Sequence, residues 1–156
     1  MHLQRNKKKS GFTLIEVLIV IGIISILATI VLIAINPTRQ FKVARDAQRT
    51  AHLISIMNNI NQNMLDHGGV FTCDGAAKAI PTAKTNIAAS DGFDIAPCLI
   101  PTYMSSLPID PSKPGASFQD EDSYDLKYSI EQDSYGRITL SADSEVNPTV
   151  AIKATR

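Results

Sequence analysis

The longest uninterrupted apolar run in the chain restricts its fold more than any other feature. It extends from Leu14 to Ile35, 22 residues that include sixteen Ile, Leu or Val and a single charged residue, Glu16. About 20 residues at roughly 1.5 Å each cross the hydrocarbon core of a bilayer, so the run predicts a membrane-spanning helix. At about −0.5 kcal/mol each, the large aliphatic residues contribute roughly −8 kcal/mol to insertion, whereas the carboxylate costs at most about 3 kcal/mol. Insertion is therefore favourable despite the acid.

Glu16 is open to three interpretations. Its carboxylate can lie near the membrane interface and reach back to water. The segment can also be a secretory signal, although its apolar run exceeds the usual length of about 7–15 residues and no clear small-residue cleavage site follows it. The third interpretation is a cut after Gly11, which makes Phe12 a new N-terminus one helical turn from Glu16. An amine and a carboxylate in lipid are each costly alone and strongly attracted as a pair.

The residues that flank this cut, KKKSG at 7–11 and FTLIE at 12–16, combine a basic segment, a glycine, a phenylalanine and the acid in one register. They resemble the leader junction of type IV pilins and type II secretion pseudopilins, and the likeness covers about the first 25 residues. The resemblance implies that a prepilin peptidase, acting also as a methyltransferase, cuts after Gly11 and methylates the amine of Phe12. It implies further that Glu16 pairs with the N-terminus of a neighbouring subunit during assembly at an inner-membrane platform.

The formal net charge of zero hides an uneven distribution of charged residues. Four of the 15 basic residues lie in the leader, which contains no acid, so 11 basic and 15 acidic residues remain after the cut, a net side-chain charge of −4. The basic cluster at 7–9 predicts a cytoplasmic N-terminus, because Lys and Arg are enriched on the cytoplasmic side of membrane helices. Everything after Ile35 is then expected outside the inner membrane. A negative mature chain does not favour nucleic-acid binding.

The apolar run ends at Asn36-Pro37, after which a helical pattern resumes. Proline removes a backbone donor and clashes with the preceding turn, so Pro37 predicts either a kink or the first position of a second helix. Gly22 is the weakest interior position of the first helix. Gly22 and Pro37 are therefore the expected sites of local flexibility in the long helix.

Residues 36–66 are expected to form an amphipathic helix that ends at the glycines after His67. The charged residues of this segment, including Arg45 and Arg49, are expected on a solvated face. The opposite face is expected to pack on the chain's own domain. Its predicted apolar stripe comprises Phe41, Ala44, Ala47, Ala51, Ile54, Met57, Ile60 and Met64.

Cys73 and Cys98 flank the least regular part of the sequence, in which a short helix is expected around residues 83–90. Two cysteines in a domain outside the cytoplasm favour a disulfide. Closing a loop of about 25 residues stabilises a fold by roughly 3 kcal/mol in the chain-entropy treatment. The alternative, a metal site that includes His67, does not match any standard zinc spacing.

The passage LIPTYMSSLPIDP at residues 99–111 resembles a stretch of pseudopilin-like proteins that leads into their small sheet. The likeness stops there, because SKPG follows where the major pseudopilins carry W-G-x-P-Y. Those proteins bind calcium in a loop at about this place, and oxygen-rich clusters suit that cation. The corresponding calcium candidates here are Asp120, Asp122 and Asp125, and the alternative is a solvated acidic loop with no cofactor.

Strand patterns close the chain. Apolar and polar residues alternate in 124–131 and in 137–142, and the turn DSYG at 133–136 predicts that these strands form a hairpin. Val150 and Ile152 indicate a third strand at an edge. The predicted fold is α+β, with a long N-terminal helix whose first half spans the membrane and whose second half packs on a small antiparallel sheet, as in pilins.

These features divide the chain into a cleaved leader at 1–11, a transmembrane and assembly helix at 12–35, an amphipathic helix at 36–66 and a pilin-like head at 67–156. The predicted function is a structural subunit of a type IV pilus-like or type II secretion pseudopilus filament. Its expected partners are copies of itself, the peptidase, the assembly platform and membrane lipids. The alternative is a monomeric single-span membrane protein whose outer domain binds a ligand or partner. An enzyme is not expected, because the chain offers no phosphate-binding loop and no compelling catalytic set.

Overall fold

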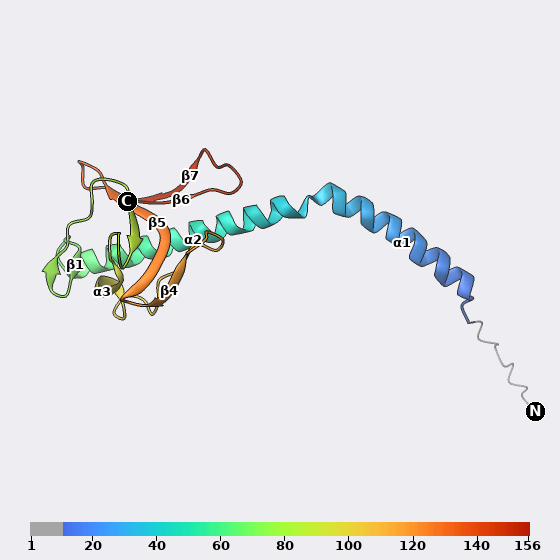
Figure 1. Cartoon of the computed structure of the whole chain (residues 1–156), viewed down its shortest axis with the longest axis horizontal. Coiled ribbons are helices and arrows are strands. Elements are labelled where there is room, and N and C mark those ends of the chain that lie inside the picture. Colours follow the sequence, from blue (N-terminus) through green and yellow to red (C-terminus); the bar gives the residue numbers. More distant parts are fainter. Residues whose placement is uncertain (1–10) are drawn as a thin grey trace, which may run out of the picture. The chain divides into compact units, whose positions relative to one another are not determined.

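The computed structural model describes residues 11–156, and the leader residues ahead of Gly11, with the basic cluster at 7–9, lie outside that range. The chain forms two compact units, and the boundary between them falls after Gln40. The first unit contains helix α1 (Leu14–Ile35), and the second contains most of helix α2 (Pro37–Asp66) together with the strands (Figure 1).

Helix α1 consists almost entirely of large aliphatic residues and has no polar face. Thr13 caps its N-terminus, and Asn36 ends it in the left-handed conformation, at φ 47°. The hydroxyls of Ser25 and Thr29 donate to the carbonyls of Ile21 and Ser25, at 2.7 and 2.9 Å, so neither hydroxyl depends on water. Within residues 11–156, α1 is the one helix long and apolar enough to cross a membrane.

A single residue, Asn36, connects the two helices. Its Oδ1 accepts a hydrogen bond from the backbone N–H of Arg39 at 3.3 Å, so the residue that ends α1 also caps α2. Pro37 is the first residue of α2, a position where its missing N–H costs no helical bond. Of the two outcomes predicted for Pro37, the structure has the second helix. At the other end of α2, Gly68 and Gly69 adopt positive φ, as expected for a helix that stops at glycine.

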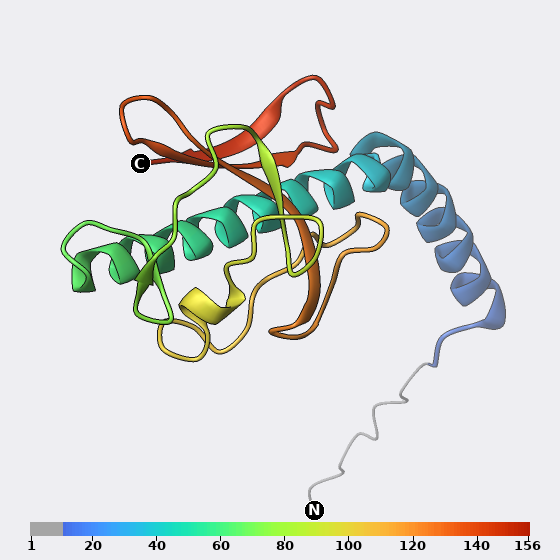
Figure 2. The same cartoon turned by 60° about the vertical axis from the view of Figure 1, so that its left-hand side comes forward.

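The head contains one antiparallel sheet of five strands in the order β3-β5-β6-β7, with β4 beside the first half of β5. The hairpin and the edge strand predicted from alternation are confirmed as β5, β6 and β7, and the fold is α+β as predicted. In Figures 1 and 2, β6 and β7 lie on one side of α2 and α3 and β4 on the other, with β5 crossing the helix. The sheet comprises β3 (Thr85–Ala88), β4 (Ser117–Asp120), β5 (Ser123–Gln132), β6 (Ile138–Asp143) and β7 (Ala151–Thr155).

Between α2 and β3, the chain forms a two-stranded ribbon of β1 (Thr72–Cys73) and β2 (Ala76–Ala77). A short helix, α3 (Ala96–Leu99), lies between β3 and β4. The helix expected around residues 83–90 is wrong, because this segment contains β3. Thr85 pairs with Ile130 of β5, so pairing in the sheet overrides the helical preference of the alanines in this segment.

The core lies between α2 and the sheet. Leu53, Ile56 and Ile60 of α2 are completely buried, and they belong to one apolar cluster with side chains from β5 and β6. Burying a large aliphatic side chain contributes about 1.5–3 kcal/mol, so this contact is the main attachment of the helix to the sheet. The β5 and β6 residues in the cluster are Tyr124, Leu126, Tyr128, Ile130, Ile138, Leu140 and Ala142.

The predicted apolar stripe on α2 is partly wrong. Met57 and Ile60 are buried as expected, but Phe41 is 64% exposed and Ile54 is 49% exposed. The buried face is turned toward Leu53 and includes the polar residues Arg49 and Asn63. The apolar residues alone do not indicate the buried face of α2, because two positions on that face carry polar side chains. Both of these side chains have partners elsewhere in the head.

Candidate functional site

The bond between Gly11 and Phe12 lies in an open, non-helical segment. No atom of the described chain comes within 4 Å of a Cβ placed on Gly11, and Phe12 is 89% exposed. The residues from Gly11 to Thr13 form no helix or strand. Gly11 and Phe12 are thus both exposed in the described part of the chain.

Glu16 lies in the first turn of α1 and forms a reciprocal cap with Thr13. The Thr13 hydroxyl accepts from the Glu16 backbone N–H at 3.3 Å, and the Glu16 Oε2 accepts from the Thr13 N–H at 2.7 Å and from its hydroxyl at 2.8 Å. The N-terminal end of a helix carries a partial positive charge that favours an acid there. Both bonds from Thr13 end on Oε2, and within residues 11–156 Oε1 accepts no hydrogen bond.

The side chains of α1 are uncovered on every side. None of its residues is buried, and its large aliphatic side chains are between 51% and 83% exposed. Gly22 lies in open space, with no atom within 4 Å of a Cβ at that position. A helix of this composition requires an apolar environment around its whole circumference. Flexibility at Gly22 and at Pro37 stays a prediction.

The predicted disulfide between Cys73 and Cys98 is present and joins β1 to α3. Asn63 of α2, which no sequence pattern indicated, forms hydrogen bonds to the backbone on both sides of this disulfide. Its Nδ2 donates to the carbonyls of Thr72 and Cys98 at 2.9 and 3.0 Å, and its Oδ1 accepts from the Thr72 N–H at 2.9 Å. Because both cysteines are in the disulfide, the alternative metal site with His67 is excluded; His67 Nδ1 instead lies 2.7 Å from the Asn63 carbonyl.

A buried cluster of charged residues joins α2 to two loops of the head. The Arg49 side chain is 1% exposed, and its Nε and Nη2 donate to Asp110 Oδ2 and Oδ1, both at 2.8 Å. Its other bonds go to Asp46 at 2.8 Å, Glu145 at 2.7 Å and the Ser112 hydroxyl at 2.7 Å. The prediction of a solvated face is therefore wrong for Arg49, because three carboxylates compensate the buried guanidinium. Arg49 lies four residues before Leu53, on the same helix face, which is the signal that could have placed it.

The carboxylates of this cluster are stabilised in their charged form. Burial alone raises the pKa of Asp110, but hydrogen bonds from Arg49 and from the backbone amides of Ser112 and Lys113 outweigh burial and hold this pKa below its usual value. The hydrogen bond from Arg45 is the largest cause that lowers the pKa of Glu145. The cluster therefore acts as a fixed ionic link between the helix and the loops at neutral pH.

The three acidic calcium candidates are not gathered around one point. Asp125 accepts from Asn86 at 2.9 Å and pairs with Lys127, whereas Asp120 accepts from the backbone N–H of Asp122 at 3.1 Å. Within residues 11–156, no group of three or more His, Cys, Asp or Glu side chains is placed to hold a metal ion. Calcium binding by this loop stays a prediction.

Comparison with known proteins finds a family motif near the N-terminus and similarity to a curated protein. Residues 6–32 match the prokaryotic N-terminal methylation motif. The prepilin peptidase-dependent protein D of Escherichia coli (strain K12) is 37% identical over 78 residues, which are 50% of this chain and 52% of that protein. The match thus spans about half the length of this curated relative. No solved structure matches the chain.

Proposed function

We propose that this chain, a type IV pilin-like or pseudopilin-like protein, is a structural subunit of a pilus-like or secretion pseudopilus filament rather than an enzyme. In this proposal the chain is anchored in the inner membrane with its N-terminus in the cytoplasm and its head outside. A prepilin peptidase cuts after Gly11, and the amine of Phe12 is methylated. The trimmed chain then leaves the membrane through an assembly platform and joins other copies through α1. The methylation motif at residues 6–32 supports the processing step.

The observation that carries the proposal is the bare apolar surface of α1. None of its 22 residues is buried. In the bilayer, lipid covers this surface; outside the bilayer, only other apolar surfaces keep it from water, at about 25 cal/mol for each Å². The α1 helices of neighbouring copies are the apolar surfaces that a filament supplies.

Glu16 gives this apolar packing a fixed register. A carboxylate in an apolar filament core is severely destabilising unless a positive partner lies against it. The new amine of Phe12 on a neighbouring copy is such a partner, and Oε1 of Glu16, which accepts no hydrogen bond within residues 11–156, is the atom that would accept from it. Within one chain, the cap formed by Thr13 keeps the carboxylate hydrogen-bonded before that partner arrives.

Two measurements test the proposal. Mass spectrometry of the chain purified from membranes is expected to show a product that begins at methylated Phe12, and Gly11→Val is expected to leave the larger precursor. Glu16→Gln preserves the shape of the side chain without its charge, so we expect normal insertion and cutting but a loss of filaments. Normal filaments from Glu16→Gln would contradict the proposed pairing. A trimmed chain that stays monomeric would instead favour the single-span binding protein.

A further inference from the structure

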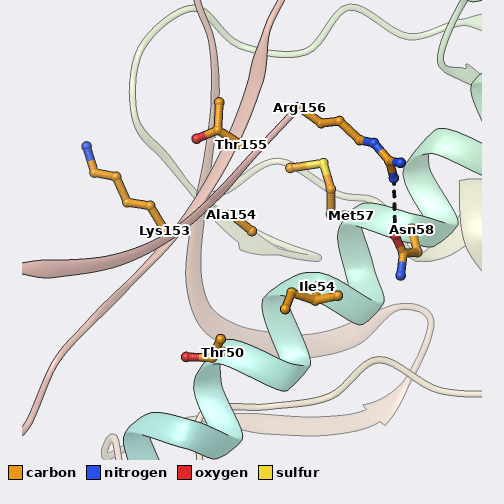
Figure 3. Close-up of a pocket in the computed structure, with 8 residues that line it drawn as sticks. All are labelled: Thr50, Ile54, Met57, Asn58, Lys153, Ala154, Thr155 and Arg156. Atoms are coloured by element: carbon orange, nitrogen blue, oxygen red, sulfur yellow. Dashed lines mark hydrogen bonds between the residues drawn. The ribbon is translucent and has the colours of Figure 1, made fainter.

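A groove runs along α2 beside the free edge of β7 (Figure 3). Its first part, about 340 Å³ in volume, has Ile54, Met57 and Ala154 among its lining residues. Lys153 lies at its rim, with a side chain that extends away from α2 (Figure 3). A second part of about 380 Å³ continues toward the end of α2, and Arg156 borders both parts. The groove therefore combines an apolar floor with a basic rim, and no acidic side chain lines it.

The basic groups at this rim have no acidic partner in the described part of the chain. Neither Lys153 nor Arg156 takes part in an ion pair within residues 11–156, and Arg156 is held over the groove by a bond of 3.4 Å from Nη1 to Asn58 Oδ1. Arg156 and Ile138 exchange both backbone hydrogen bonds across β6 and β7. By the alternation of an antiparallel ladder, the backbone N–H of Thr155 points to the free edge of β7. The rim thus offers several donors that suit carboxylates.

The complementary surface lies in the turn between β4 and β5. Residues 120–122 are three consecutive acidic residues, all exposed, and none takes part in an ion pair within residues 11–156. This turn adjoins Ser123, at the start of β5. Lys153 is on β7, two strands across the sheet, and lies level with Ser129 near the other end of β5. The separation along β5 is roughly 20 Å at about 3.3 Å per residue, well beyond the Debye length of about 8 Å. The two surfaces of one head therefore do not satisfy each other.

We propose that the acidic turn at 120–122 of one copy docks at the basic rim of the α2–β7 groove of the next copy. The two surfaces differ and lie on opposite sides of α2, as Figure 1 shows for β4 and β7. A contact between unlike surfaces joins copies head to tail, and such a contact propagates into an open helical array when its rotation does not close into a ring. The inference rests on the proposed filament and names the head contact that accompanies packing of α1.

Engineered disulfides test this contact directly in cells that assemble the full-length chain. A chain with both Glu121→Cys and Thr155→Cys is expected to give a ladder of covalent multimers after mild oxidation. Each single variant alone is expected to stay monomeric, and a mixture of the two single variants is expected to give dimers only. Dimers from a single variant, a cross-link to another protein, or no cross-link in filaments that do form would each overturn the inference.

Charge reversal provides an independent test. Lys153→Glu combined with Arg156→Glu places like charges opposite the acidic turn. We therefore expect the number of filaments to fall by a factor of about ten or more. Adding Asp120→Lys and Asp122→Lys is expected to restore them, whereas Lys84→Glu, on an exposed loop, serves as the control with no loss. Cutting after Gly11 is measured in every variant. Filaments that form equally well after charge reversal would refute the contact and leave the proposed function intact, whereas an unaltered chain that is trimmed but never polymerises would refute the proposed function.

Discussion

Arg49 of α2 and Asp110, in the loop that precedes β4, form a two-point ion pair inside the head, with Nε–Oδ2 and Nη2–Oδ1 distances of 2.8 Å. The Asp110 carboxylate is completely buried, and its backbone N–H donates to the Leu126 carbonyl of β5 at 3.1 Å. The pair therefore fastens the helix to the sheet at a point where β5 pairs with neither β4 nor β6. Removing one partner leaves the other charge buried without compensation.

We expect Arg49→Met to lower the free energy of unfolding of the head by about 3–5 kcal/mol, because Asp110 then stays buried without its cation. Urea denaturation of the detergent-solubilised full chain, followed by circular dichroism, measures this change. Arg137→Met is the matched control, since its pair with Asp133 is exposed and exposed pairs contribute little. Equal losses of unfolding free energy from the two substitutions would show that the buried pair stabilises the head no more than the exposed pair does.

The same cluster predicts how stability changes with pH. The pKa of Asp110 is lower in the folded head than in the unfolded chain, where an aspartate titrates near 3.9. Its contribution to stability is therefore fully present above that value and is lost as the pH falls through the lower, folded pKa. We expect the free energy of unfolding to fall below about pH 4, and to fall less steeply in Asp110→Asn. Parallel pH curves for the two proteins would contradict this assignment.

Local patterns predicted the elements of this fold better than its polar contacts. Tyr124, Leu126, Tyr128 and Ile130 alternate with polar residues, and each of the four is buried in β5 as the period of a strand requires. The pairing of Arg49 with a carboxylate 61 residues away leaves no comparable local signal, because it depends on how the helix and the loops pack.

The candidate site shows the same division. Gly11, Phe12 and Glu16 could be proposed as site residues because they lie within one stretch of six residues. The partner of Glu16 within the chain, the backbone and hydroxyl of Thr13, follows from its position three residues earlier. The groove beside β7 arises only when a helix face and a strand edge distant in sequence come together, so no pattern in the sequence could have located it.

Asn63 provides a third prediction, which concerns the disulfide loop. Asn63→Leu leaves the N–H and carbonyl of Thr72 and the carbonyl of Cys98 without partners in a buried region, so we expect a loss of about 3 kcal/mol in the free energy of unfolding. Asn59→Leu is the control, because its side chain bonds only to the preceding turn of α2. The same urea titration compares them, and a loss in Asn63→Leu no larger than in the control would contradict the role of this amide.

Gly92 provides the last prediction, because it lies against the backbone of β3. A Cβ at this position would lie 2.6 Å from the Asn86 carbonyl oxygen and 3.0 Å from the Ala88 nitrogen, and backbone atoms cannot move aside as a flexible side chain can. The Asn86 carbonyl also accepts from the Phe93 N–H at 2.7 Å, so a shift there disturbs the link between β3 and the following loop.

We therefore expect Gly92→Ala to lower the free energy of unfolding by about 1–3 kcal/mol, as overpacking does in other cores. Gly22→Ala is the matched control, since a Cβ there has no neighbour within 4 Å and α1 lies outside the head. Hydrogen exchange of the β3 amides separates a local effect from a general one, and we expect Gly92→Ala to accelerate it. Unchanged exchange and unchanged unfolding would mean that β3 yields to the methyl group without cost, and that the close approach of Gly92 is not required for the sheet edge.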